Sequence, residues 1–206
     1  MARPRFEKVP QERRQSIIEA AAREFGQHGY EQASLNRILE AAELSKGSAY
    51  YYFDDKADVF FTVVMAARAA LTAGATTEIE ALTARDFWKR ARSEYVRQML
   101  IFRRHRWIMD AGRAAWTLPE HLRQEGPLAE LFKLGRARLL RFIVHGRKLG
   151  VVRDDLPDEL ALSLTLAVDR AFDTWLLKHL DTLDDEGIRK HAELLVDTLR
   201  RLYAPA

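Results

Sequence analysis

A short stretch near residue 50 gathers side chains that donate hydrogen bonds. It supplies an ammonium, a hydroxyl and three phenols, from Lys46, Ser48, Tyr50, Tyr51 and Tyr52. Donors of this kind, together with the N–H groups at a helix N-terminus, suit phosphate oxygens. Gly47 has no side chain, so the backbone could approach a duplex closely there, and Lys46 and Tyr50 could reach base edges in a major groove. The stretch therefore predicts a surface that binds nucleic acid.

Lys56 follows at the start of the next predicted helix. A cation in the first turn of a helix is opposed by the helix dipole, whereas Asp54, Asp55 and Asp58 suit that end. A bound phosphate would favour a lysine at this position. The alternative is that Lys56 pairs with Asp54 or Asp55.

Two short helices position the donor-rich stretch. Ser34 is a good N-cap, and the apolar residues after it, Leu35, Ile38, Ala41 and Ala42, have the spacing of one helix face. This helix is expected to end near Glu43. Ser45 then caps a second helix, and the tight connection between the two predicts a helix-turn-helix.

These residues carry a resemblance to a known family. Phe25, Gly29-Tyr30, Ser34, Ile38, the run from Ser45 to Phe53, and Lys56 resemble the N-terminal signature of the TetR family of bacterial transcriptional regulators. The resemblance implies an all-α homodimer of about nine helices, with an N-terminal three-helix DNA-binding domain and a variable C-terminal helical domain that binds a small effector or a partner. Glu43, where a glycine is common, and Ala49, where a larger aliphatic is usual, depart from the pattern.

The residues expected to bind a double-stranded DNA operator lie on the two short helices and just after them. They are Ser34, Asn36, Arg37, Ser45, Lys46, Gly47, Ser48, Tyr50, Tyr51, Tyr52 and Lys56. We expect a DNA-binding domain over residues 1–55, with a basic and flexible N-terminal arm, and an effector-binding and dimerisation domain over residues 56–206. The arm holds five basic residues, Arg3, Arg5, Lys8, Arg13 and Arg14, against Glu7 and Glu12.

Composition limits the remaining possibilities. The chain has 206 residues, 48% of them hydrophobic, and a formal net charge of +3, which permits an anionic partner without requiring one. It has no cysteine, hence no disulfide framework and no thiol nucleophile. The charged N-terminus lacks the apolar run of a signal peptide, and no stretch is long enough to span a membrane. A soluble protein of the bacterial cytoplasm is expected.

Longer helices are predicted over residues 11–28, 56–81, 86–110, 127–148, 158–179 and 186–203. The helix from Lys56 would bridge the two domains as one rod. The last two helices carry apolar residues beyond the needs of one chain's core, so a two-fold mate is expected to cover them. The predicted dimer residues are Leu164, Ala171, Trp175, Ile188, Ala192, Leu195, Leu199 and Leu202. A dimer also suits the two halves of a near-palindromic operator.

The middle of the chain is rich in aromatic and thioether side chains, which could line an effector pocket. The candidates are Trp88, Tyr95, Met99, Phe102, Trp107, Trp116 and Phe132, with ordinary core packing as the alternative. Asp169 and Asp173 lie one helical turn apart in an apolar helix, where a buried carboxylate needs a partner. They could orient a cationic or hydroxylated ligand, or pair with Arg170 or with an arginine across the dimer interface. The arginines from Arg90 to Arg106 favour a solvated face.

An enzyme is the remaining class to consider. The runs Asp54–Asp58 and Asp154–Asp158 spell a DDxxD pattern that resembles the magnesium-diphosphate motif of helical prenyl-chain synthases. That chemistry needs the carboxylates inside a helix, facing an apolar cavity, whereas both runs begin helices. Helix capping explains them better, and we expect no catalytic residue, no metal site and no cofactor. The sequence thus favours a ligand-responsive transcriptional repressor over its alternative, an architectural DNA-binding dimer without an effector.

Overall fold

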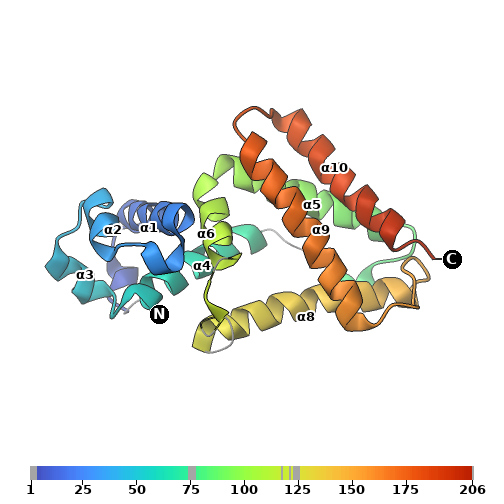
Figure 1. The fold of residues 1–206 in the computed structure, drawn as a ribbon, viewed down its shortest axis with the longest axis horizontal. Helices are drawn as coiled ribbons and strands as arrows, with labels where there is room; N and C mark the ends of the chain where they lie inside the picture. The colour runs from blue at the N-terminus through green and yellow to red at the C-terminus, as the bar shows by residue number, and fades with distance from the viewer. Residues whose placement is uncertain (1–3, 74–77, 117, 121, 123–125, 206) are drawn as a thin grey trace. The chain divides into compact units, whose positions relative to one another are not determined.

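The computed structural model describes residues 4–73, 78–116, 118–120, 122 and 126–205, and for Lys46, Ser48, Ala49, Trp116 and residues 126–128 it describes the backbone alone. In this part of the chain every regular element is a helix, nine of them α-helices, which confirms the predicted all-α fold (Figure 1). The chain forms two compact units. Unit 1 comprises Met1–Ala73 and His105–Glu130, and unit 2 comprises Gly74–Arg104 and Leu131–Ala206.

Unit 1 contains the predicted helix-turn-helix. Its elements are the 3-10 helix η1 (Phe6–Lys8), α1 (Gln11–Gln32), α2 (Leu35–Ala41), α3 (Lys46–Tyr52), α4 (Lys56–Thr72) and α6 (Arg106–Trp116). The core forms where Phe60 of α4 meets Phe25 of α1 edge to face, with ring centroids 5.0 Å apart. Gly29 adopts a positive φ of 71° inside the range of α1. This residue turns the chain so that Tyr30 stacks on Phe25.

The turn between α2 and α3 shows how the chain manages without a glycine. Glu43 has a φ of 50°, a left-handed conformation that a glycine would adopt without strain. The side chain of Arg13, from α1, donates a hydrogen bond of 2.7 Å to the carbonyl oxygen of Glu43. The amide of Leu44 donates to the carbonyl of Leu39 at 2.7 Å. These bonds hold the turn, and they give Arg13 a structural partner.

Helices α1 and α6 approach closely at Gly26. A Cβ atom on Gly26 would lie 2.6 Å from Cβ of Asp110 and 2.9 Å from its Cα. Only a glycine allows the two backbones to come this near. Burial raises the pKa of Asp110, although the guanidinium of Arg113, 2.8 Å away, acts in the opposite direction. Helix α6 is therefore packed tightly against α1, the helix that also contacts α2 of the helix-turn-helix.

Three predicted helices have bounds that differ by several residues in the structure. The helix expected over residues 11–28 runs to Gln32, with a kink at Gly29. The helix expected over residues 56–81 ends at Thr72, and Ala73 leaves it with a ψ of 122°. Ile79 fits the apolar spacing of the predicted helix. In the structure it is buried in a separate 3-10 helix, η2 (Ile79–Ala81), which belongs to unit 2. The helix expected over residues 86–110 divides at His105 and then runs through Gly112, which costs a helix interior only about 1 kcal/mol.

Unit 2 packs four helices around one apolar cluster. They are α5 (Phe87–Arg104), α8 (Gly126–Lys148, which joins this unit at Leu131), α9 (Asp158–His179) and α10 (Asp185–Leu202). The buried cluster consists of Leu82, Phe87, Ile143, Val152, Ala161 and Tyr203. Phe87 is stacked on Phe142 with 4.2 Å between ring centroids, which joins α5 to α8. Helices α9 and α10 lie side by side, and α10 also contacts α5 (Figure 1).

The compact units differ from the predicted domains. The predicted domain boundary lies after residue 55, at the start of α4, whereas in the structure α4 and α6 pack against α1 in unit 1. Apolar contacts such as that between Phe25 and Phe60 draw α4 into the first unit. None of the helices in the described ranges is both long enough and apolar enough to cross a bilayer.

The predicted dimer residues fall into two groups. On α9, Trp175 and Ala171 are exposed and Leu164 is partly exposed. On α10 the prediction is wrong for Ile188, Ala192 and Leu195, because these side chains are buried within their own unit and are not available to a partner. Leu199 and Leu202 are partly buried and pack against the apolar cluster of unit 2. The narrow apolar row of α10 thus serves its own chain.

Candidate nucleic-acid interface

The exposed face of α3 presents two of the three predicted phenols. Tyr50 is 62% exposed and Tyr51 is 48% exposed, while Gly47 also lies at the surface. Tyr52 is instead partly buried, with its ring edge-on to Phe6 at 5.8 Å. Phe53 is buried, as expected for the inner side of the helix. Large aromatic side chains left in solvent on a short helix are available to a partner.

The remaining predicted DNA-binding residues lie on or beside α2 and α3. Asn36, Arg37 and Ser45 are exposed, and Ser34 is partly exposed and caps α2 by accepting a hydrogen bond from the amide of Arg37. The side chains of Lys46 and Ser48 fall outside the part of the chain that is described. The backbone of α3 nevertheless confirms that a helix begins at Lys46, one residue after the predicted cap.

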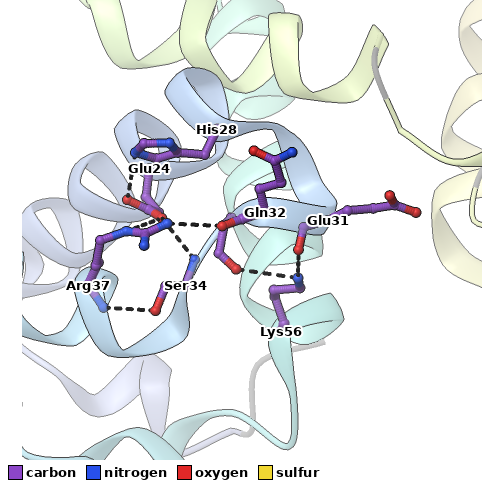
Figure 2. A network of polar contacts seen from close by, with 8 residues as sticks. Glu24, His28, Glu31, Gln32, Ser34, Arg37 and Lys56 are labelled. Carbon is purple, nitrogen blue, oxygen red and sulfur yellow. Dashed lines mark hydrogen bonds and ion pairs between the residues drawn. The ribbon is translucent and has the colours of Figure 1, made fainter.

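A polar network joins α1, α2 and α4 behind this face (Figure 2). Its centre is Glu24, a buried carboxylate that accepts hydrogen bonds of 2.8 Å from Nε of Arg37 and from the backbone amide of Ser34. Burial alone would raise the pKa of Glu24, but the bonds from Arg37 and Ser34 outweigh it, and the pKa lies below its usual value. Arg37 also donates to the carbonyl of Gln32 at 2.9 Å.

Lys56 has a structural role that was not predicted: it binds carbonyl oxygens at the end of α1. Its ammonium donates hydrogen bonds to the carbonyl oxygens of Glu31, at 2.9 Å, and Ala33, at 3.4 Å (Figure 2). These carbonyls lie at the C-terminal end of α1, where the helix dipole favours a cation. The favourable dipole at the end of α1 offsets the unfavourable dipole at the start of α4. A lysine at this position is therefore explained without a bound phosphate. Contacts of Arg37 and Lys56 with DNA remain predictions, and these hydrogen bonds would compete with them.

The aspartates before α4 cap the helix. Asp55 is the N-cap residue and accepts a hydrogen bond of 2.8 Å from the amide of Asp58. Asp58 in turn accepts from the amide of Asp54 at 3.0 Å. The arrangement is similar to a capping box, except that the Asp58 side chain binds the amide of Asp54, one residue before the N-cap. The first DDxxD run is thus accounted for by helix capping, as the sequence analysis favours.

Unit 2 contains a cavity of about 370 Å³ between α5 and α8. It is lined by Ile79, Leu82, Arg90, Ala91, Glu94, Tyr95, Gln98, Gly135, Arg138, Leu139 and Phe142. Tyr95 is the one predicted effector residue among them. Arg90, Glu94 and Gln98 are spaced four residues apart along α5, and this spacing places them on one face of the helix. A polar row of this kind could indicate a cavity lining, but it is also typical of the solvated face that was predicted for Arg90.

The two predicted aspartates meet Tyr95 in the interior of unit 2. The hydroxyl of Tyr95 donates a hydrogen bond of 3.1 Å to Asp173. Burial raises the pKa of both carboxyls, to about 6 for Asp169 and, with the added charge of Asp169, to about 7 for Asp173. In the described part of the chain neither forms an ion pair with an arginine or a lysine. The structure therefore brings together three of the predicted effector residues, from α5 and α9.

The other predicted effector residues do not line this cavity. Trp88 packs against the apolar cluster and donates its indole N–H to the carbonyl of Val151 at 3.3 Å. Met99 is buried, and Phe102 and Phe132 are partly buried. Trp107 belongs to α6 of unit 1, and the side chain of Trp116 is not among those described. For Trp88 and Met99, core packing is the better explanation.

Comparison with known proteins supports the same reading. Residues 17–63 match the sequence profile of the family described as bacterial regulatory proteins, tetR family. The HTH-type transcriptional repressor AcnR of Corynebacterium efficiens is 28% identical over 93% of this chain and 95% of its own. The HTH-type transcriptional regulator AcrR of Shigella flexneri is 44% identical over 24% of this chain and 23% of its own.

Solved structures show the same fold. A TetR family transcriptional regulator from Chloroflexus aurantiacus superposes with a TM-score of 0.72 at 23% identity, over 99% of each chain. PfmR, a TetR family regulator from Thermus thermophilus, gives 0.62 at 20% identity, over 90% of this chain and 94% of its own. The matched profile spans α2, α3 and most of α1, where the exposed phenols and the capped turns lie. Residues 17–63 of this chain thus match the TetR family of bacterial regulatory proteins, and the fold of the whole described chain is that of solved TetR family regulators.

Proposed function

We propose that this chain is a transcriptional repressor that binds a near-palindromic DNA operator as a homodimer and is released by a small-molecule effector. The observation that carries the DNA-binding part is the exposed pair Tyr50 and Tyr51, beside Gly47, on α3. The preceding helix, α2, is capped by Ser34 and joined to α1 by the Glu24 network. Relatives named as transcriptional repressors support it. Because such a protein acts on chromosomal DNA, we place it in the bacterial cytoplasm.

Single substitutions on α3 test the contact face. Tyr50→Ala and Lys46→Ala should each weaken operator binding by about 1 to 3 kcal/mol, because each removes a donor from the surface that meets the duplex. The affinity is measured by fluorescence anisotropy with a duplex that the wild-type protein has enriched from a random library. Dimerisation, followed by analytical ultracentrifugation, should not change. If both variants keep wild-type affinity, the DNA-contact face lies elsewhere.

The homodimer is expected to form through the exposed side of α9. Leu160 and Trp175 are each 46% exposed, and Leu194 of α10 is 60% exposed. Ala167 and Ala171 are also exposed and lie between Leu160 and Trp175 at helical spacing. These residues form an apolar strip that a second copy would bury, in place of the predicted residues of α10 that face their own core.

Trp175→Glu tests this interface. The charge would have to be desolvated in the contact between two copies, so the dimer should dissociate at concentrations at which the wild type stays dimeric. Sedimentation velocity measures the change. Glu193→Gln, an equally exposed position of α10, is the control and should remain dimeric. A Trp175→Glu protein as dimeric as the wild type would exclude this strip as the interface.

The cavity between α5 and α8 is the proposed effector site. Helix α6 lies between α5 and α8 in the chain, and it packs on α1 at Gly26. A shift of α5 or α8 could therefore move α6 and, through α1, the helix-turn-helix. An effector changes operator affinity only if it binds the two arrangements unequally. A metabolite library screened for a rise in melting temperature, followed by operator binding with each hit, tests this site. A protein that binds DNA but no metabolite would be the architectural dimer instead.

A further inference from the structure

The segment before α1 is folded against α3. Phe6 is 3% exposed, and its ring centroid lies 5.0 Å from that of Phe53 and 5.8 Å from that of Tyr52. The amides of Lys8 and Val9 donate to the carbonyls of Arg5 and Phe6 and close the turn of η1. The segment expected to be a flexible arm is thus a structured turn in residues 4–9.

A second contact fixes this turn to α1. A guanidinium N–H of Arg14 donates to the carbonyl oxygen of Glu7 at 3.2 Å. The buried ring of Phe6 and this bond hold the segment from two sides. The position of its exposed side chains relative to α3 is therefore set by the fold.

Arg5 is the side chain that this turn places beside the reading face. Its guanidinium carbon lies 4.6 Å from the ring centroid of Tyr51, which is half exposed on α3. A guanidinium stacked on a ring keeps its N–H donors in its own plane, free to bind an anion. Within the described ranges Arg5 forms no ion pair with a carboxylate. Its charge is therefore not neutralised by a carboxylate among the residues that the structure describes.

We propose that Arg5 contacts the sugar–phosphate backbone of the operator, and that Phe6 is the positioning residue that holds Arg5 beside α3. The proposal rests on the proposed function, because it needs α3 to lie on a duplex. Phosphates are the anions that a guanidinium meets beside a groove-binding helix, and contacts with them set register rather than sequence preference. The DNA-contact surface then includes η1 as well as the helix-turn-helix.

The salt dependence of Arg5→Ala tests the phosphate contact. With the duplex enriched by the wild-type protein, Arg5→Ala should bind about tenfold more weakly, and the slope of log affinity against log salt should fall by about one. Arg136→Ala, an exposed arginine of α8 in unit 2, is the matched control and should change neither quantity. If the wild type binds and Arg5→Ala keeps both affinity and slope, the inference is wrong. A wild type that binds no duplex would instead overturn the proposed function.

A double-mutant cycle tests the role of Phe6. If Phe6 positions Arg5, removing Arg5 in a Phe6→Ala background should have little further effect on affinity or on the salt slope. Phe6→Leu, which keeps an apolar side chain of similar size, should restore most of the Arg5 contribution. A residue that only stabilised the fold would lower the melting temperature and leave the Arg5 effect at full size in both backgrounds. That result would exclude the positioning role.

Discussion

Phe60→Ala is expected to lower the free energy of unfolding of unit 1 by about 3 to 5 kcal/mol, the cost of removing a fully buried aromatic side chain. The Phe60 ring is inaccessible to solvent and lies edge-on to both Phe25, at 5.0 Å, and Tyr30, at 5.3 Å. It is the point at which α4 is joined to α1 and to the turn after Gly29. Urea denaturation followed by circular dichroism measures the loss.

Met65→Ala is the control for this experiment. Met65 lies on the same helix but is 37% exposed, so its replacement should change stability by about 0.5 kcal/mol or less. Operator binding by Phe60→Ala should fall with the fraction of folded unit 1, because α2 and α3 rest on the same support. A Phe60→Ala protein as stable as Met65→Ala would mean that α4 is not anchored by this ring cluster.

Asp173→Asn is expected to raise the free energy of unfolding above pH 8 by about 2 to 4 kcal/mol, to raise it less at pH 5, and to leave it nearly unchanged below about pH 4. The pKa of Asp173 is raised in the folded state to about 7, and that of Asp169 is also raised, because both carboxyls are buried. The folded protein therefore holds more protons than the unfolded chain between about pH 4 and pH 7. The stability that the pair contributes is fully present at the acid end of this window and is lost as the pH rises.

The measurement is the difference in unfolding free energy between wild type and variant at several pH values. The difference isolates the pair from groups such as Glu24, whose lowered pKa acts in the opposite sense. Asparagine can still accept the hydrogen bond from Tyr95, so the change removes the charge and keeps the contact. Asp154→Asn, at an exposed aspartate, is the control and should show no pH-dependent gain. A constant difference from pH 5 to pH 8 would show that Asp173 titrates normally.

The sequence predicts the helix-turn-helix, α2 and α3, well because the signals there are local. The cap at Ser34 and the apolar spacing of α2 depend on neighbours within one or two turns. The bounds of α9 were also predicted correctly, since Pro157 precedes the first residue of that helix and its apolar pattern is long. In such segments the pattern itself contains the physical cause.

The prediction fails where a residue's partner is distant in sequence. The sequence does not reveal that Lys56 donates to the carbonyls of Glu31 and Ala33, because these acceptors belong to the end of another helix. The row of Ile188, Ala192 and Leu195 was assigned to a dimer interface because an apolar stripe does not reveal which helix it faces. Glu24, the centre of the network behind α2, had no local signal at all.

The effector residues show the same limit. Tyr95 and Met99 lie one turn apart on α5 and are both apolar enough for a core, yet Tyr95 lines a cavity and Met99 is buried. Only the packing of α5 against α8 separates them. The polar cavity residues Arg90 and Glu94 could not be distinguished by spacing from a solvated helix face.

The central claim is that α3 carries the surface by which two copies of this chain read DNA. Its most direct test is selection of bound duplexes from a random library by the purified protein at low salt, followed by sequencing. If two copies of α3 bind DNA, the selected duplexes should be enriched in an inverted repeat with half-sites one or more helical turns apart. The double variant Tyr50→Ala with Tyr51→Ala should lose this enrichment. A selected pool indistinguishable from the starting library, or one that the double variant enriches equally well, would contradict it.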